Sequence, residues 1–206
     1  GAGEGDCEKA CASIIAAFDG EKDPRCVLLL SDAWVILPQA FARCGDEGVA
    51  AYAANAEELY DVAASYFPVS FTPPRGDAIK ITRRQLAEAV ERAMCASPAF
   101  APWAVPHALE SLNPELGAQK MADAARAVRA MGRAWGADVM REHLDVIWRA
   151  MRAALAHPNA TKNENDDIDD TRHATTPMAV MTTMFASEWG GEALARRALE
   201  DACVRD

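Results

Sequence analysis

The chain has 206 residues, half of them apolar, and carries 31 acidic against 21 basic residues for a formal net charge of −10. Such a chain can bury a sizeable core. The acidic balance argues against a protein that follows the backbone of DNA or RNA, because phosphate binding depends on lysine and arginine displacing counterions. We therefore expect no direct nucleic-acid contact.

The six cysteines are widely spaced, apart from Cys7 and Cys11. This spacing lacks the density of a disulfide framework and indicates a reducing compartment. No stretch reaches the run of about 18 apolar residues that a membrane span needs, and no signal peptide is visible, so we expect no membrane association. The chain begins without Met and within a helical pattern, so we interpret it as part of a longer protein.

Abundant alanine and scarce β-branched residues favour helices from the start of the chain. A first helix is predicted over about 6–18. Asp23 is expected to cap a second helix. Pro24 suits the first position of that helix, and Pro38 is expected to kink or end it. A third helix is predicted over about 49–66.

The helical pattern stops over 67–81, a proline-rich irregular connection in which residues before prolines are pushed to extended geometry. Thr82 and Gln85 then form the capping box of a helix that reaches about Cys95. Ser97-Pro98 starts the next helix, and Asn113-Pro114 breaks it.

Four further helices and a loop are predicted toward the end of the chain. The first of these helices closes at Gly136, and the second runs from Asp138 to about Leu155. A polar loop over 159–170 precedes a helix over about 171–189 and a last helix from Glu192.

No segment alternates as a strand does. A unit of proline-containing helix, short turn, second helix and glycine stop recurs at a period of about 40–47 residues, and its best copy spans 100–136. Such units bury their apolar faces by stacking. We therefore predict one all-α segment over 1–206, a HEAT/armadillo-type solenoid of antiparallel helix pairs. The alternative is an irregular helical bundle.

Catalytic and metal-binding patterns are missing from the sequence. Cys7 and Cys11 lie one helical turn apart, but no further ligands lie nearby, which favours buried structural thiols. The four histidines follow no metal-binding spacing, and the acidic run over 163–170 lacks the Gly and Glu that a calcium loop requires. We expect no catalytic residue, no metal site and no cofactor.

The segment from Tyr66 to Pro74 is the most unusual, because it places aromatic residues and prolines in one extended stretch between helices. Two interpretations stay open: a plug in the groove between two repeats, or a pre-ordered ridge that a partner protein binds. The candidate partner-binding residues are Tyr66, Phe67, Pro68, Phe71, Thr72, Pro73 and Pro74.

Four strings in the chain carry a family resemblance. They are DGEKDPR at 19–25, LYDV at 59–62, YFPVSFTPP at 66–74 and ITR at 81–83. In order and spacing they resemble the N-terminal region of the MMS-nineteen (Met-eighteen) family of HEAT-repeat proteins, over about 18–152. The chain departs from the family at 75–80, where a further proline-containing turn is usual.

This resemblance implies a non-catalytic scaffold subunit of the cytosolic iron–sulfur protein assembly (CIA) targeting complex. The implied partners are other cytosolic iron–sulfur assembly factors and apo iron–sulfur proteins such as DNA helicases and polymerases. The implied compartments are cytoplasm and nucleus, and the implied processes are DNA repair, replication and transcription.

Two alternatives remain at this point. A different HEAT-repeat adaptor, for transport or for a phosphatase, would share the helical background but not the four strings. A HEAT-like DNA glycosylase would cradle DNA in a basic concavity, which the net charge of −10 argues against.

Overall fold

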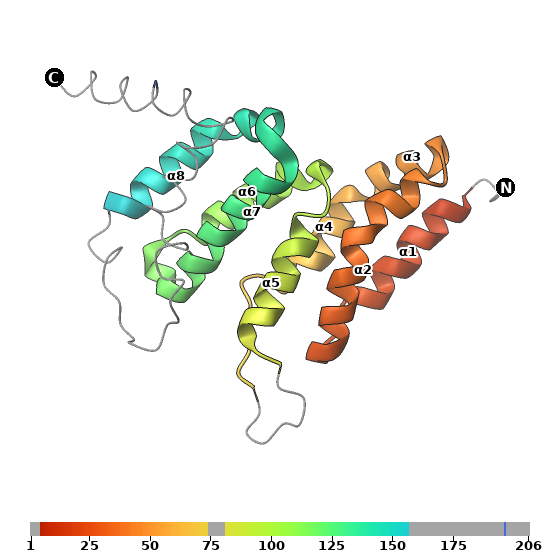
Figure 1. Ribbon diagram of the computed structural model, residues 1–206, viewed down its shortest axis with the longest axis horizontal. Helices are drawn as coiled ribbons and strands as arrows, with labels where there is room; N and C mark the ends of the chain where they lie inside the picture. The colour runs from red at the N-terminus through yellow and green to blue at the C-terminus, as the bar shows by residue number, and fades with distance from the viewer. Residues whose placement is uncertain (1–4, 74–80, 157–195, 197–206) are drawn as a thin grey trace. The chain divides into compact units, whose positions relative to one another are not determined.

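The computed structural model describes residues 5–73, 81–156 and 196, and within these ranges its regular elements are helices and no strand occurs (Figure 1). The all-α prediction is confirmed for this part of the chain. The chain divides into two compact units, residues 1–104 and 105–206. Stacking of helix pairs into one solenoid over 1–206 stays a prediction.

The first unit is built around its second helix. Its elements are α1 (Asp6–Phe18), α2 (Pro24–Ala42), α3 (Asp46–Ala54), α4 (Ala56–Ala64), α5 (Arg83–Met94) and the short 3-10 helix η1 (Pro98–Phe100). α2 packs against α5, α3 and α1, while α4 packs against α1 and α5. The largest fully buried side chains of this core are Phe18, Trp34, Leu59, Tyr60, Met94 and Phe100.

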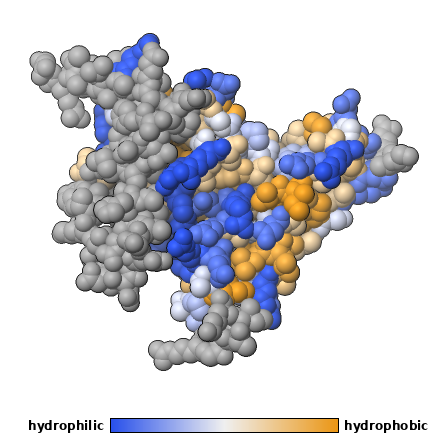
Figure 2. All heavy atoms as spheres, in the orientation of Figure 1, coloured by the Kyte–Doolittle hydropathy of each residue, from blue (hydrophilic) through white to orange (hydrophobic). Residues whose placement is uncertain are grey.

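α2 is 19 residues long with a mean hydropathy of 1.3, so by length and composition alone it could cross a membrane. Its Ser31 and Trp34 are buried among the neighbouring helices, and Asp32 accepts a 2.6 Å hydrogen bond from Arg92 of α5. These contacts involve one side of α2, since 22% of its apolar stretch is buried within the unit. α2 also exposes apolar side chains such as Leu29 and Ile36, and Figure 2 shows apolar surface in the region of α2.

Helix starts follow the predicted capping chemistry. The Asp23 carboxylate accepts the Arg25 N–H at 2.9 Å, with Pro24 in the first position of α2. The Thr82 hydroxyl accepts the Gln85 N–H at 3.2 Å, and the Gln85 side chain accepts the Thr82 N–H at 2.8 Å, which completes the capping box. α2 continues past Pro38 to Ala42, so that proline does not end the helix.

The prediction of a single helix over 49–66 is wrong. The chain forms α3 and α4 instead, and Asn55 separates them with φ −104° and ψ 12°. The Asn55 side-chain amide donates to the Ala51 carbonyl at 2.8 Å, which also accepts the Asn55 N–H at 3.2 Å. An asparagine side chain that competes for backbone groups in this way disfavours helix continuation.

The second unit contains most of the remaining helices. α6 (Ala101–Glu110) carries the chain from one unit into the other, followed by the 3-10 helix η2 (Pro114–Leu116), α7 (Ala118–Glu142) and α8 (Leu144–Ala156). Gly136 lies within α7 with φ 80° and ψ −177°, which confirms the predicted helix end. The helix predicted from Asp138 to Leu155 is interrupted at His143, whose N–H bonds the Met140 carbonyl in a tightened turn.

The two units share a local backbone pattern. Gly45 (φ 77°, ψ −158°) precedes a short helix that ends at Asn55, and Gly136 precedes a short helix that ends at His143 (φ −103°, ψ 3°). A further helix follows each of these residues, α4 after Asn55 and α8 after His143. The two glycines are about 90 residues apart, or about two periods of 40–47 residues. The predicted loop over 159–170 and the last two predicted helices lie outside the described residues.

Replacing Thr82 with alanine is expected to lower the free energy of unfolding by about 1 kcal/mol, because it removes the cap of α5. Urea unfolding followed by circular dichroism measures this change. Thr72→Ala, at an exposed position outside any helix, is the control and is expected to leave stability nearly unchanged. Equal losses in the two variants would contradict the capping role.

Candidate partner-binding surface

Three of the four family-like strings meet at one end of the first unit. The Tyr66 hydroxyl donates to the Phe18 carbonyl at 2.7 Å, next to the turn that starts at Asp19. The Arg83 side-chain Nε donates to the Val69 carbonyl at 2.9 Å. We call the residues 19–25, 66–73 and 82–83 the turn surface. The sequence strings that are far apart along the chain therefore form one continuous structural feature.

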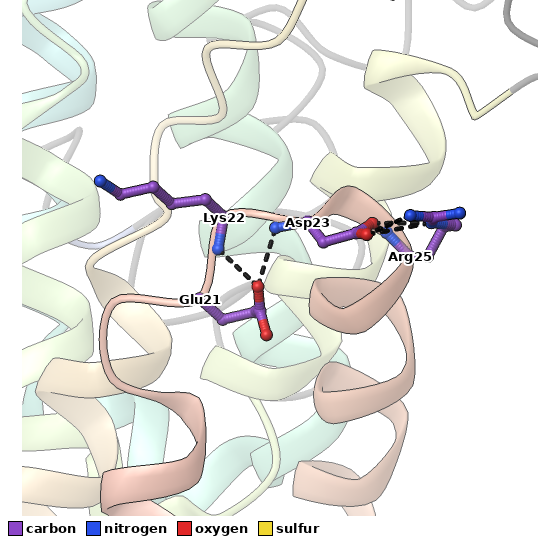
Figure 3. Close-up of polar contacts among 4 residues, drawn as sticks. All are labelled: Glu21, Lys22, Asp23 and Arg25. Atoms are coloured by element: carbon purple, nitrogen blue, oxygen red, sulfur yellow. Dashed lines mark hydrogen bonds and ion pairs between the residues drawn. The ribbon is translucent and has the colours of Figure 1, made fainter.

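Acidic side chains of the turn itself fix the backbone at 21–25. One oxygen of the Glu21 carboxylate accepts the N–H groups of Lys22 at 2.7 Å and Asp23 at 2.8 Å (Figure 3). These two bonds lower the pKa of Glu21. The Asp23 carboxylate binds the Arg25 guanidinium and N–H, which lowers the pKa of Asp23 to about 2. The Lys22 side chain points away from these contacts (Figure 3).

A stack of aromatic rings anchors the segment that begins at Tyr66. The Tyr66 ring lies 5.1 Å from the Phe18 ring, centroid to centroid, with an interplanar angle of 20°. Phe18 also contacts Trp34 of α2 at 4.8 Å. Burial raises the pKa of the Tyr66 hydroxyl, and the nearby charges of Glu21 and Asp19 act in the same direction.

The predicted site residues differ in how far they are exposed to solvent. Phe67 is buried, Tyr66, Pro68 and Phe71 are half-buried, Thr72 and Pro73 are exposed, and Pro74 lies outside the described residues. The peptide bond between Phe67 and Pro68 is cis, and the Phe67 N–H bonds the Ala64 carbonyl at 2.9 Å. The segment therefore contacts the core through Phe67 and Val69, and its exposed residues are Ser70, Thr72 and Pro73.

Sequence reasoning missed two parts of this surface. The Tyr66 ring stacks on Phe18, which in turn contacts Trp34, and neither residue was among the predicted site residues. The exposed Lys22 was also missed, and the DGEKDPR string that contains it was the available signal. Within the described ranges, no group of three or more His, Cys, Asp or Glu side chains is arranged to hold a metal ion. The expected absence of a metal site stays a prediction.

The low pKa of Asp23 gives a pH dependence that can be tested with Asp23→Asn, since asparagine retains the capping oxygen. The folded pKa of about 2 lies below the ordinary value of 3.8, so the carboxylate stabilises the fold above that value. The stability difference between wild type and variant is expected to be constant above about pH 5 and to vanish toward pH 2. Thermal unfolding across this range measures it, and a pH-independent difference would refute the ion-pair account.

Replacing Tyr66 with phenylalanine removes the hydrogen bond to the Phe18 carbonyl and keeps the ring stack, so we expect a loss of about 1 kcal/mol in unfolding free energy. Tyr66→Ala removes both and is expected to cost about 2–4 kcal/mol. Denaturant titrations of the two variants separate these contributions. Identical losses would show that the ring stack contributes nothing.

Comparisons with known proteins support the family resemblance that the four strings carry. The family model described as "Dos2-interacting transcription regulator of RNA-Pol-II" (MMS19_N) matches residues 4–157. The MMS19 nucleotide excision repair protein homologue of Arabidopsis thaliana is 30% identical over 140 residues, which cover 68% of this chain and 12% of the relative. The human homologue is 30% identical over 155 residues, or 75% of this chain and 14% of the relative.

The Drosophila melanogaster MMS19 nucleotide excision repair protein is 29% identical over 155 residues, covering 75% of this chain. The matches span only 12–15% of the length of these relatives. No solved structure is significantly similar to the chain. The family match includes the whole turn surface and three quarters of the sequence, so the chain belongs to the MMS19 family and corresponds to its N-terminal region.

Proposed function

We propose that this chain is a scaffold arm that holds partner proteins and has no catalytic activity of its own. As in the resemblance described above, the partners would be other cytosolic iron–sulfur assembly factors and apo iron–sulfur proteins such as DNA helicases and polymerases. The observation that carries the proposal is membership of the MMS19 family over residues 4–157. The relatives are named as nucleotide excision repair proteins, which supports a connection to DNA repair.

The repeat character of the backbone supports a scaffold role. The glycine-led pattern at Gly45 and Gly136 returns after about two periods of 40–47 residues, as expected if both units derive from one kind of helical repeat. Stacked repeats of this kind form elongated surfaces that several proteins can bind at once. We therefore propose that stacked helix pairs form a HEAT-type solenoid in the longer protein.

The turn surface is the docking site that we favour within this arm. Its exposed residues include Lys22, Thr72 and Pro73, and the contacts of Glu21, Tyr66 and Arg83 fix the backbone near them. The backbone there is already ordered before a partner binds. Binding therefore costs less conformational entropy than binding to a flexible loop would. Exposed residues on a fixed loop are typical of recognition surfaces.

The compartments that we propose are the cytoplasm and the nucleus. Within the described ranges no cysteine forms a disulfide, as is usual for proteins in a reducing compartment. The net charge of −10 makes direct DNA binding by this arm unfavourable. We therefore propose that any DNA connection runs through the bound proteins.

The test is affinity capture of the full-length protein from cells, with and without residues 1–206, followed by quantitative mass spectrometry. We expect the full-length protein to capture iron–sulfur assembly factors and iron–sulfur clients, and the shortened one to lose a subset of the clients. Capture of neither class by the full-length protein would contradict the proposed function.

A pair of substitutions locates the docking site. Lys22→Glu with Pro73→Arg changes charge and shape on the turn surface, and we expect at least a tenfold loss of the clients that depend on this arm, or about 1.4 kcal/mol. Lys9→Glu with Val49→Arg makes the same kind of change at exposed positions on α1 and α3 and serves as the control. Equal capture by the two double variants would exclude the turn surface as the docking site.

A further inference from the structure

Thiols gather in the first unit where the start of α1 lies against the start of α3. The Gly5 N–H bonds a Glu47 side-chain oxygen at 3.1 Å, and further along α1 the Cys11 sulfur lies 3.9 Å from the Ala51 carbonyl oxygen. Cys7 lies between these two contacts on the buried side of α1. The contacts therefore fix Cys7 beside the turn that precedes α3.

That turn contains Cys44, whose side chain lies close enough to that of Cys7 to interact with it electrostatically. The Cys44 N–H bonds the Phe41 carbonyl at 2.9 Å, and its sulfur lies 3.6 Å from the Ala40 carbonyl oxygen. A Cβ atom at Gly48 would lie 2.7 Å from the Cys44 Cβ and 2.1 Å from the Phe41 carbonyl oxygen. Gly48 thus allows α3 to pack against Cys44, so backbone contacts hold both thiols in place.

The two thiols differ in access to solvent. Cys44 is exposed, whereas Cys7 is only 5% exposed and Cys11 is fully buried. Burial, together with the neighbouring Cys44, raises the pKa of the Cys7 thiol, so Cys7 by itself reacts slowly with dissolved reagents. An exposed thiol beside a buried one is the arrangement in which the first reacts with a small molecule and the second resolves the product.

We propose that Cys44 and Cys7 form a reversible modification site, oxidised to an intramolecular disulfide by a low-molecular-weight disulfide such as oxidised glutathione. The Cys44 thiolate attacks one glutathione sulfur, a bond forms between them, and the other glutathione leaves as a thiolate that takes up the released proton. The Cys7 thiolate then attacks the Cys44 sulfur and expels the second glutathione. Two protein thiols are oxidised, and one glutathione disulfide is reduced to two thiols.

The disulfide would join α1 to the turn between α2 and α3 and close a loop of about 40 residues. Such a link restricts the unfolded chain, so the oxidised protein is expected to melt higher by on the order of 10 °C. Because the attacking species is a thiolate, the reaction is expected to speed up as the pH rises from 7 to 9. Reductants would reverse it, so the stability of this arm would follow the thiol–disulfide balance of its surroundings.

The test incubates the reduced 206-residue chain with oxidised glutathione, blocks remaining thiols by alkylation, and applies intact-mass measurement and peptide mapping. We expect wild type to lose two hydrogens, to retain no glutathione, and to yield one linked peptide pair containing Cys7 and Cys44. Cys7→Ser is expected to stop at a glutathione adduct on Cys44. Cys44→Ser is expected to form neither product and to show no rise in melting temperature.

Cys26→Ser serves as the matched control, because Cys26 is a half-buried thiol elsewhere in the same unit, and this variant is expected to behave as wild type. Linkage of Cys7 to Cys11, or of Cys44 to any cysteine other than Cys7, would overturn the proposal. A stable glutathione adduct on wild-type Cys44 without linkage would overturn it as well, since it would show that Cys7 cannot reach the Cys44 sulfur.

Discussion

The first unit depends on the contact of Phe18 with Trp34 on one side and Tyr66 on the other. Phe18 is fully buried and Trp34 is 1% exposed, so the stack lies in the core at the ends of α1 and α4 and in the middle of α2. Each aromatic pair adds about 0.5–1.5 kcal/mol beyond the burial of its area. The stack therefore fixes the position of the chain at the end of α1 and just after α4. Two segments of the turn surface begin at these points.

The contacts within the turn surface fit the docking role that we propose for it. Its acidic residues bind backbone N–H groups and Arg25, so their charges stabilise the turn itself. The exposed side chains of this surface include those of Lys22, Arg25, Thr72 and Pro73. A preorganised surface of this kind suits the scaffold role that we propose, and the match to the MMS19_N family model over residues 4–157 includes all of it.

Capping chemistry explains which helix boundaries could be predicted from the sequence. The starts of α2 and α5 and the break at Gly136 depend on residues within four positions of each boundary, so the sequence reveals them. The breaks at Asn55 and His143 were not predicted, because neither residue is a glycine or proline and both lie within continuous helical patterns. The backbone pattern that Gly45 and Gly136 share was likewise not predicted, because it is seen only in the φ and ψ angles.

The sequence by itself determined the helical class, the main helix ends, the irregular connection after α4 and the family, because each of these depends on local patterns or on strings of adjacent residues. Only the tertiary structure decided which residues of Tyr66–Pro73 are buried, that the turn at Glu21 lies beside them, and that Cys7 meets Cys44. These outcomes require contacts between residues about 40–50 positions apart, and such contacts are fixed by how the helices pack, since close packing admits few arrangements of large side chains.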